Sequence, residues 1–270
     1  MRHFSTNTFM RNSLLRFRTF ALSLAGLVST MLAFGLLGNS AHAQTTFDWN
    51  ATSPYWDIGT GWTPGGPPGS NDIARFQMAV TDTIVWDATT GNRNTGELQI
   101  LAGNYTFDNT TATQYELTLN STSSSAFLLS GGSTTSTVKG LHFNVANGGA
   151  TITGGATLIL DGSASAGTRL SVDDDLLIHD GHFNITAGAV AGNTNGYIGE
   201  SAGSTGIATV TGSGSQWNNS NLLYVGESGT GTLSVEEGGL VSNSRGVIGR
   251  FSGSTGTATV TGSGSQWNNS

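Results

Sequence analysis

The densest group of side chains able to do chemistry is an acidic run in the middle of the chain. Asp173, Asp174 and Asp175 are consecutive, and Asp180 follows shortly after. Carboxylate oxygens at this density could hold calcium. The run matches neither the D-x-[DN]-x-[DN]-G calcium loop nor the glycine-rich nonapeptide repeat of calcium-binding β-rolls. We therefore interpret it as a solvated turn, with Asp173, Asp175 and Asp180 as the candidate metal ligands.

The histidines give no stronger signal. Beyond residue 43 the chain has His142, His179 and His182, and the last two flank Asp180. That spacing suggests a metal, but there is no third ligand at the usual distance and no H-E-x-x-H motif. We interpret all three as surface or turn residues. The chain also lacks cysteine and a P-loop, and we predict no catalytic residue and no cofactor.

An internal repeat indicates how these residues are positioned. Residues 198–220 recur at 248–270, with 19 of 23 positions identical at an offset of 50, and a related unit occupies 225–244. Successive units therefore start at Ile198, Val225 and Ile248. About 25 residues suits one coil of a β-solenoid with two or three short strands. The length after residue 43 then predicts about eight coils.

Alternation within each unit predicts which side chains are buried. Apolar residues alternate with Thr and Ser, so the following pairs should point inward: Ala208 and Val210, Leu233 and Val235, Ala258 and Val260. Equivalent positions should stack along the axis and form hydrogen-bonded columns of Asn, Ser and Thr. Trp217 and Trp267 recur at one position. They could form a sugar-binding ladder, but packing at a coil corner explains them more simply.

The remaining segments fit the same architecture. Residues 44–80 hold all four prolines and the aromatic residues Trp49, Tyr55, Trp56 and Trp62. We interpret them as an N-terminal cap, with the aromatics packed inside it rather than forming a sugar-stacking platform. Residues 81–195 read as irregular coils and 196–270 as regular repeats. The clearest strand runs before the repeat are 81–87, 96–103, 115–121, 126–131, 140–148, 156–162, 169–181 and 182–190.

Residues 1–43 are typical of an export signal. Four arginines precede an apolar run from Phe20 to Leu37, and Ala41-His42-Ala43 is a small-x-small cleavage site, which predicts a mature start at Gln44. An uncleaved membrane anchor is the alternative. Without this segment the chain keeps 6 of its 10 basic residues and all 17 acidic ones, a formal charge of −11. This balance argues against nucleic acid as a partner.

The repeat resembles a known family. The motifs TGTATVTG, GSQW and GTLSVEEGGLVS within 198–270 are similar to the repeat of autotransporter (type V secretion) passengers and PEP-CTERM-associated proteins. A run from Trp56 to Pro64 and another from Asn71 to Phe76 resemble openings common in such proteins. The resemblance implies a right-handed parallel β-helix at, or released from, a bacterial surface, without catalytic residues. The chain stops inside a repeat, so we interpret it as C-terminally truncated.

We therefore expect a non-enzymatic, exported β-solenoid associated with the bacterial outer membrane or secreted, which acts as an adhesin-like structural protein. Its expected partners are polysaccharide or cell-surface components, with no membrane span in the mature chain and a monomeric state. The alternative is a β-helix polysaccharide lyase or hydrolase, which would use stacked Asp with Arg or Lys. Arg169 beside the acidic run is the one feature that favours it.

Overall fold

Short strands separated by tight turns make up nearly all of the described chain, as the alternation predicted. The structure, a computed structural model, describes residues 44–270, except for the side chains of residues 122–124. The expected export signal lies outside the described residues. Residues 44–270 form one unit, and within it the helical structure is a single 3-10 turn, η1 (Gly59–Gly61).

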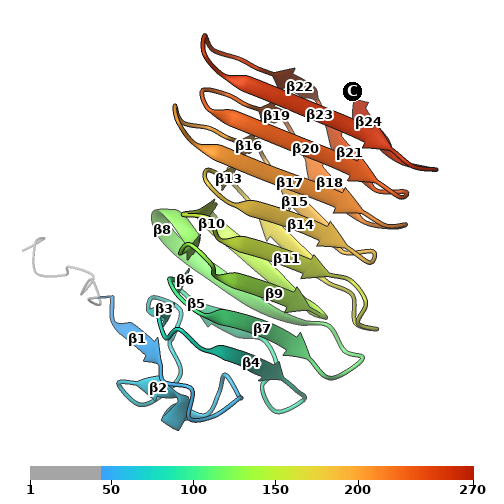
Figure 1. The fold of residues 1–270 in the computed structure, drawn as a ribbon. Coiled ribbons are helices and arrows are strands. Elements are labelled where there is room, and N and C mark those ends of the chain that lie inside the picture. The colour runs from blue at the N-terminus through green and yellow to red at the C-terminus, as the bar shows by residue number, and fades with distance from the viewer. Residues whose placement is uncertain (1–43) are drawn as a thin grey trace, which may run out of the picture. The chain divides into compact units, whose positions relative to one another are not determined.

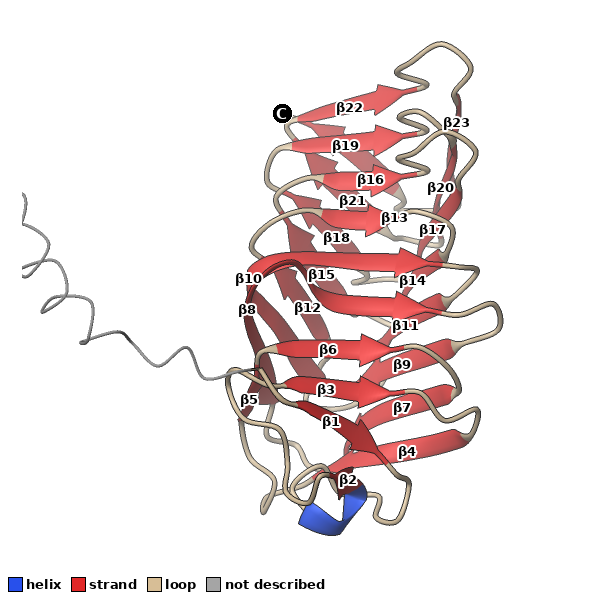
Figure 2. Ribbon diagram, turned by 90° about the vertical axis from the view of Figure 1, so that its left-hand side faces the viewer, coloured by secondary structure: helices blue, strands red, loops and turns tan. Residues whose placement is uncertain are grey.

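The strands stack into three faces around a common core (Figures 1 and 2). The first face holds the second halves of β8 (Tyr115–Ser130) and β10 (Leu141–Thr153), together with β1 (Thr46–Trp49), β3 (Ile73–Phe76), β6 (Glu97–Ile100), β13 (Leu176–Ile178), β16 (Gly196–Ile198), β19 (Leu222–Val225) and β22 (Arg245–Ile248).

The second face is a sheet of its own, made of β4 (Thr81–Trp86), β7 (Asn104–Asn109), β9 (Thr135–Lys139), β11 (Thr157–Asp161), β14 (His182–Thr186), β17 (Thr205–Thr211), β20 (Thr230–Glu236) and β23 (Thr255–Thr261). The third face holds the first halves of β8 and β10, together with β5 (Arg93–Thr95), β12 (Arg169–Val172), β15 (Val190–Asn193), β18 (Gln216–Asn219), β21 (Leu240–Asn243) and β24 (Gln266–Asn269). Because β8 and β10 continue around a corner, the first and third faces join into one sheet.

Each coil visits the three faces in turn, and eight such coils follow β1 within residues 44–270. Neighbouring coils pair in parallel. On the second face Thr157 pairs with His182, and the register continues in even steps through Ile207, Thr232 and Thr257. The predicted all-β parallel β-helix, with coils of about 25 residues, is therefore confirmed.

The core is a continuous apolar column. Ala208, Val210, Leu233 and Val235 are fully buried, as expected. Val260 is 45% exposed instead, because its strand β23 is the outermost of its face in the described chain. Burial thus follows the predicted alternation everywhere except where no further coil is present to cover the residue.

The first end of the stack is covered by the aromatic segment. Here β2 (Trp62–Thr63) pairs antiparallel with β1, whereas the other strand pairs of the described chain are parallel. Trp49, Trp56 and Trp62 are fully or nearly fully buried, and Trp62 makes edge-to-face contacts with the other two at ring distances of 5.0 and 4.9 Å. The three tryptophans therefore pack within the predicted cap, which is formed together with η1 (Figure 2). Tyr55 was expected to pack there too, but it is 38% exposed.

A buried column of asparagines links successive coils on the third face. The indole N–H of Trp217 donates to Asn193 Oδ1 at 2.6 Å, and Asn193 Nδ2 donates to Asn219 Oδ1 at 2.8 Å. Trp267 makes the same 2.6 Å bond to Asn243. The repeated tryptophans therefore pack inside the coil and donate to the asparagine column, which confirms the structural interpretation over the sugar ladder.

Close stacking also explains one column of glycines. A Cβ placed on Gly231 would lie 2.2 Å from the backbone N of Gly226 and 2.3 Å from the carbonyl oxygen of Ile198. Only glycine fits this position without moving the neighbouring coil.

Across residues 44–270 the structure contains no helix long and apolar enough to cross a membrane.

Candidate functional site

The acidic run lies at the corner between β12 and β13. Asp173 and Asp174 are exposed, as a solvated turn should be, while Asp175 is half-buried. Asn195 Nδ2 donates to Asp175 Oδ1 at 2.8 Å, and Asn221 Nδ2 donates to Asn195 Oδ1 at 3.0 Å on the next coil. Asp175 is thus the first member of a polar column that runs along the axis.

Asp180 lies on the other side of β13, at the corner between the first and second faces. Its Oδ1 accepts a hydrogen bond from the backbone N of Thr205 at 2.7 Å. The strand β13 separates it from Asp173 and Asp175. Among residues 44–270, no group of three or more His, Asp or Glu side chains is arranged to hold a metal ion.

The three histidines occupy different environments. His182 is exposed on the second face. His179 lies between two carboxylates, with Nδ1 3.5 Å from Glu200 Oε2 and Nε2 3.8 Å from Asp180 Oδ2. His142 is only 18% exposed, on the third face. His182 is thus freely exposed, whereas His142 lies on the outer surface but is held between neighbouring side chains.

A second group of polar side chains forms on the outer surface of the first face and its corner. Tyr197 of β16 and Tyr224 of β19 are paired in register, and their rings stack at 5.0 Å with an interplanar angle of 16°. Glu200 and Glu227 follow them at equivalent places, one coil apart. We call these four residues, with His179, the tyrosine–acid patch.

Arg250 covers one end of this patch. Its guanidinium lies 4.9 Å above the Tyr224 ring and forms an ion pair with Glu227. Tyr224 is consequently buried, and Glu227 keeps only 12% of its side-chain surface. Glu200 is 37% exposed, and the equivalent position on the coil after it holds Glu227 instead of a cation. The open part of the patch is therefore Tyr197, Glu200 and His179.

Burial and like charges perturb the titration of this region. Burial, with further contributions from Asp175 and Glu227, raises the pKa of Tyr197 to about 12. Burial also raises the pKa of Asp175, although the hydrogen bond from Asn195 opposes this, and Asp174 and Glu200 raise it further. The Tyr197 hydroxyl therefore stays a hydrogen-bond donor at neutral pH, beside carboxylates that accept.

Stacking decides which interactions the patch can make. One face of each tyrosine ring lies against the other ring, and Arg250 covers Tyr224 further. These covered faces are closed to a stacked sugar ring. The hydroxyl of the half-buried Tyr197 and the carboxylate of Glu200, which is 37% exposed, suit hydrogen bonds to a ligand rich in hydroxyl groups.

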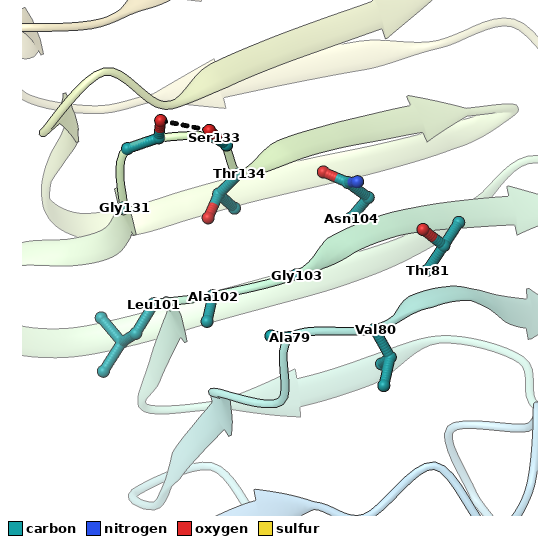
Figure 3. A pocket seen from close by; sticks show the side chains of 11 residues that line it. Ala79, Val80, Thr81, Leu101, Ala102, Gly103, Asn104, Gly131, Ser133 and Thr134 are labelled. Carbon is teal, nitrogen blue, oxygen red and sulfur yellow. Dashed lines mark hydrogen bonds between the residues drawn. The ribbon is translucent and has the colours of Figure 1, made fainter.

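The same corner is hollow in the earlier coils. A depression of about 380 Å³ crosses three connections, and Figure 3 shows Thr81, Asn104 and Thr134 around it. Its other lining residues are small or apolar, and none of the lining residues is charged. Asn104 Oδ1 already accepts from the backbone N of Thr135 at 2.8 Å. This hollow therefore offers fewer free polar groups to a ligand than the tyrosine–acid patch does.

Sequence reasoning missed the patch, although a signal for it exists. The string Tyr-Ile-Gly-Glu-Ser at 197–201 recurs as Tyr-Val-Gly-Glu-Ser at 224–228. In the repeat at 248–270 the corresponding residues are Ile-Gly-Arg-Phe, so the motif itself changes there. A tyrosine and a glutamate repeated one coil apart must lie side by side once the coils stack.

No family model, curated protein or solved structure matches this chain.

Proposed function

We propose that the chain is an extracytoplasmic β-solenoid, displayed at the cell surface or secreted, which acts as an adhesin-like structural protein. In this proposal the tyrosine–acid patch binds neutral polysaccharide. The observation that carries it is the in-register repetition of a tyrosine and a glutamate on adjacent coils.

Charge and hydrogen bonding favour neutral over anionic glycans. Beyond residue 43 the chain carries 6 basic and 17 acidic residues, so an anionic polymer would be repelled. Carboxylates accept hydrogen bonds from sugar hydroxyls, and the Tyr197 hydroxyl, which is protonated at neutral pH, can donate to a sugar oxygen. The hydroxyl groups of a neutral polysaccharide can both donate to the carboxylates and accept from the tyrosine.

Export rests on the signal-like residues 1–43 and on the resemblance to surface passenger repeats. Secretion in a Gram-negative host, followed by intact-mass measurement, tests it. A product that begins at Gln44 in the extracellular or outer-membrane fraction is expected. A product that keeps residues 1–43 in the inner membrane would instead support the anchor alternative.

A glycan array tests the binding function. The purified protein should bind neutral polysaccharides, and Glu200→Gln should lower the apparent affinity about tenfold, since hydrogen bonds to charged groups contribute roughly 1.5–3 kcal/mol. Glu237→Gln is the matched control, because Glu237 is exposed at the corner between the second and third faces. Binding that is absent, or equally reduced by the control, would reject the patch.

A further inference from the structure

His142 connects two side chains from neighbouring coils on the outer surface of the third face. Its Nδ1 lies 3.0 Å from Glu116 Oε2, and its Nε2 lies 2.9 Å from Ser171 Oγ. Glu116 comes from β8, His142 from β10 and Ser171 from β12. A carboxylate on one ring nitrogen and a hydroxyl on the other is the arrangement that activates serine in acyl-transfer enzymes.

The carboxylate is held in place by two further hydrogen bonds. Thr118 Oγ1 donates to Glu116 Oε1 at 2.6 Å, and Asn144 Nδ2 donates to the same oxygen at 3.0 Å. Although burial works to raise it, these bonds and His142 keep the pKa of Glu116 below its ordinary value. Glu116 therefore stays ionised and favours the proton on His142 Nδ1, which leaves Nε2 free to accept the Ser171 proton.

The histidine is prepared to act as a base. Burial lowers the pKa of His142, the nearby Arg169 lowers it further, and Glu116 opposes both. The imidazole is consequently neutral at neutral pH, the form that a general base requires. These charged neighbours come from the two strands that pair with β10 at this position, since Glu116 and Arg169 are the register partners of His142.

The surroundings of Ser171 suit an incoming carbonyl group. Arg169 precedes Ser171 by two positions, lies on the same side of β12 and is exposed. Its guanidinium can stabilise negative charge on a carbonyl oxygen. In the next coil the register partner of Ser171 is Gly192, which carries no side chain to cover the hydroxyl. Ser171 is only half-buried on this outer surface, so an acyl group attached to it would stay in contact with solvent.

We propose that Ser171 and His142, positioned by Glu116, form an acyl-transfer site that hydrolyses carboxylic esters with small acyl groups. Ser171 Oγ attacks the carbonyl carbon while its proton moves to His142 Nε2. The bond to the alcohol oxygen breaks, and His142 returns the proton to the leaving alcohol. Water then attacks the acyl-serine with the same base and releases the acid. This function goes beyond glycan binding and departs from the expectation of a non-enzymatic chain.

Labelling and turnover test the proposal on the purified protein. A fluorophosphonate probe followed by peptide mass spectrometry should modify Ser171, and 4-nitrophenyl acetate should be hydrolysed. Ser171→Ala should abolish labelling at that position, and His142→Gln should lower both rates at least about 100-fold. Ser242→Ala should keep the wild-type rate, because Ser242 lies in the same outer column but bonds Asn218 at 2.8 Å and no histidine.

The pH profile separates a positioning role for Glu116 from a structural one. In the wild type, turnover should rise as His142 loses its proton, with a midpoint below the ordinary histidine value of about 6.5. Glu116→Gln should lower the rate and move this midpoint further down, because the carboxylate that supports the charged imidazole is removed. The proposal is overturned by the absence of a label on Ser171, by equal labelling of Ser242, or by a Ser171→Ala variant with undiminished turnover.

Discussion

Val210 and Val260 provide an internal comparison of burial in nearly identical sequence. They occupy the same repeat position, and residues 204–220 and 254–270 differ only at Ile207 and Thr257. Val210 is fully buried, whereas Val260 is 45% exposed. We predict that Val210→Ala destabilises the protein by about 2–3 kcal/mol and Val260→Ala by less than about 1 kcal/mol.

The magnitudes follow from the neighbours of each residue. Val210 is paired with Ile185 on one side and Val235 on the other, so truncation leaves an enclosed cavity. Two buried methyl groups are worth roughly 1.6 kcal/mol of transfer free energy, and the cavity adds about 1 kcal/mol. Val260 pairs with Val235 alone among described residues. Val260→Ala therefore loses only about half of that transfer free energy and leaves no closed cavity.

Urea unfolding followed by far-ultraviolet circular dichroism measures both variants against wild type. Terminal repeats can unfold separately from the rest of a solenoid, so amide hydrogen exchange in β17 and β23 should accompany it. Equal free-energy costs for the two variants would refute the reasoning, because Val260 would then be packed as deeply as Val210. If Val210→Ala cost no more than an ordinary surface substitution, about 0.5 kcal/mol or less, the enclosed core would be refuted.

Three further predictions concern single side chains. Trp217→Phe should lower the free energy of unfolding by about 1–3 kcal/mol, because Asn193 Oδ1 loses its indole donor in a buried site. Urea unfolding measures this. The prediction is contradicted if the free-energy costs of Trp217→Phe and Asn193→Ala simply add in the double variant. Gly231→Ala should lower the free energy of unfolding by about 3 kcal/mol or more, because the new Cβ would overlap with the adjacent coil. Gly192→Ala should lower it by less than about 1 kcal/mol, because its new Cβ would lie 3.8 Å from the nearest neighbouring atom. Thermal unfolding of the two variants measures this difference. The pKa of Asp175 is raised by burial, so the folded state binds its proton more tightly than the unfolded state and stability falls as pH rises from 3.8 through the folded pKa. Asp175→Asn should therefore stabilise the protein at neutral pH, with the gain lost below about pH 3.8; an equal gain at pH 3 and pH 7 would count against this assignment.

The strands that the sequence predicted are those with strong apolar alternation. Regions near β4, β6, β11 and β14 were recognised from their own residues. The runs Asn104–Asn109 and Thr135–Lys139 were not among the clearest, although they form β7 and β9. Both are short and rich in Asn, Thr or Ser, and their strand state is stabilised by pairing with each other across coils. Local preference was too weak to reveal them.

Candidate site residues were harder to predict than strands. The acidic run forms a turn, as interpreted, and Trp217 is packed as expected, although it lies within strand β18 and not at a coil corner. The environment of His142 was missed because its partners Glu116 and Ser171 belong to the coils before and after it, far from it in the chain. Neither spacing forms a local motif. Only the stacking of β8, β10 and β12 brings the three side chains together.

The sequence alone determined the coil size, the inward and outward alternation and the aromatic cap, because these depend on local periodicity and on residue type. Tertiary structure decided which outer side chains become neighbours. Coil lengths vary, since the step along the chain from Leu176 to its partner Gly196 is much shorter than the step from Tyr105 to its partner Ser136. Register across coils is set by backbone hydrogen bonding and core packing together, so the patch at Tyr197 and the serine–histidine pair at His142 appear only when the coils are stacked.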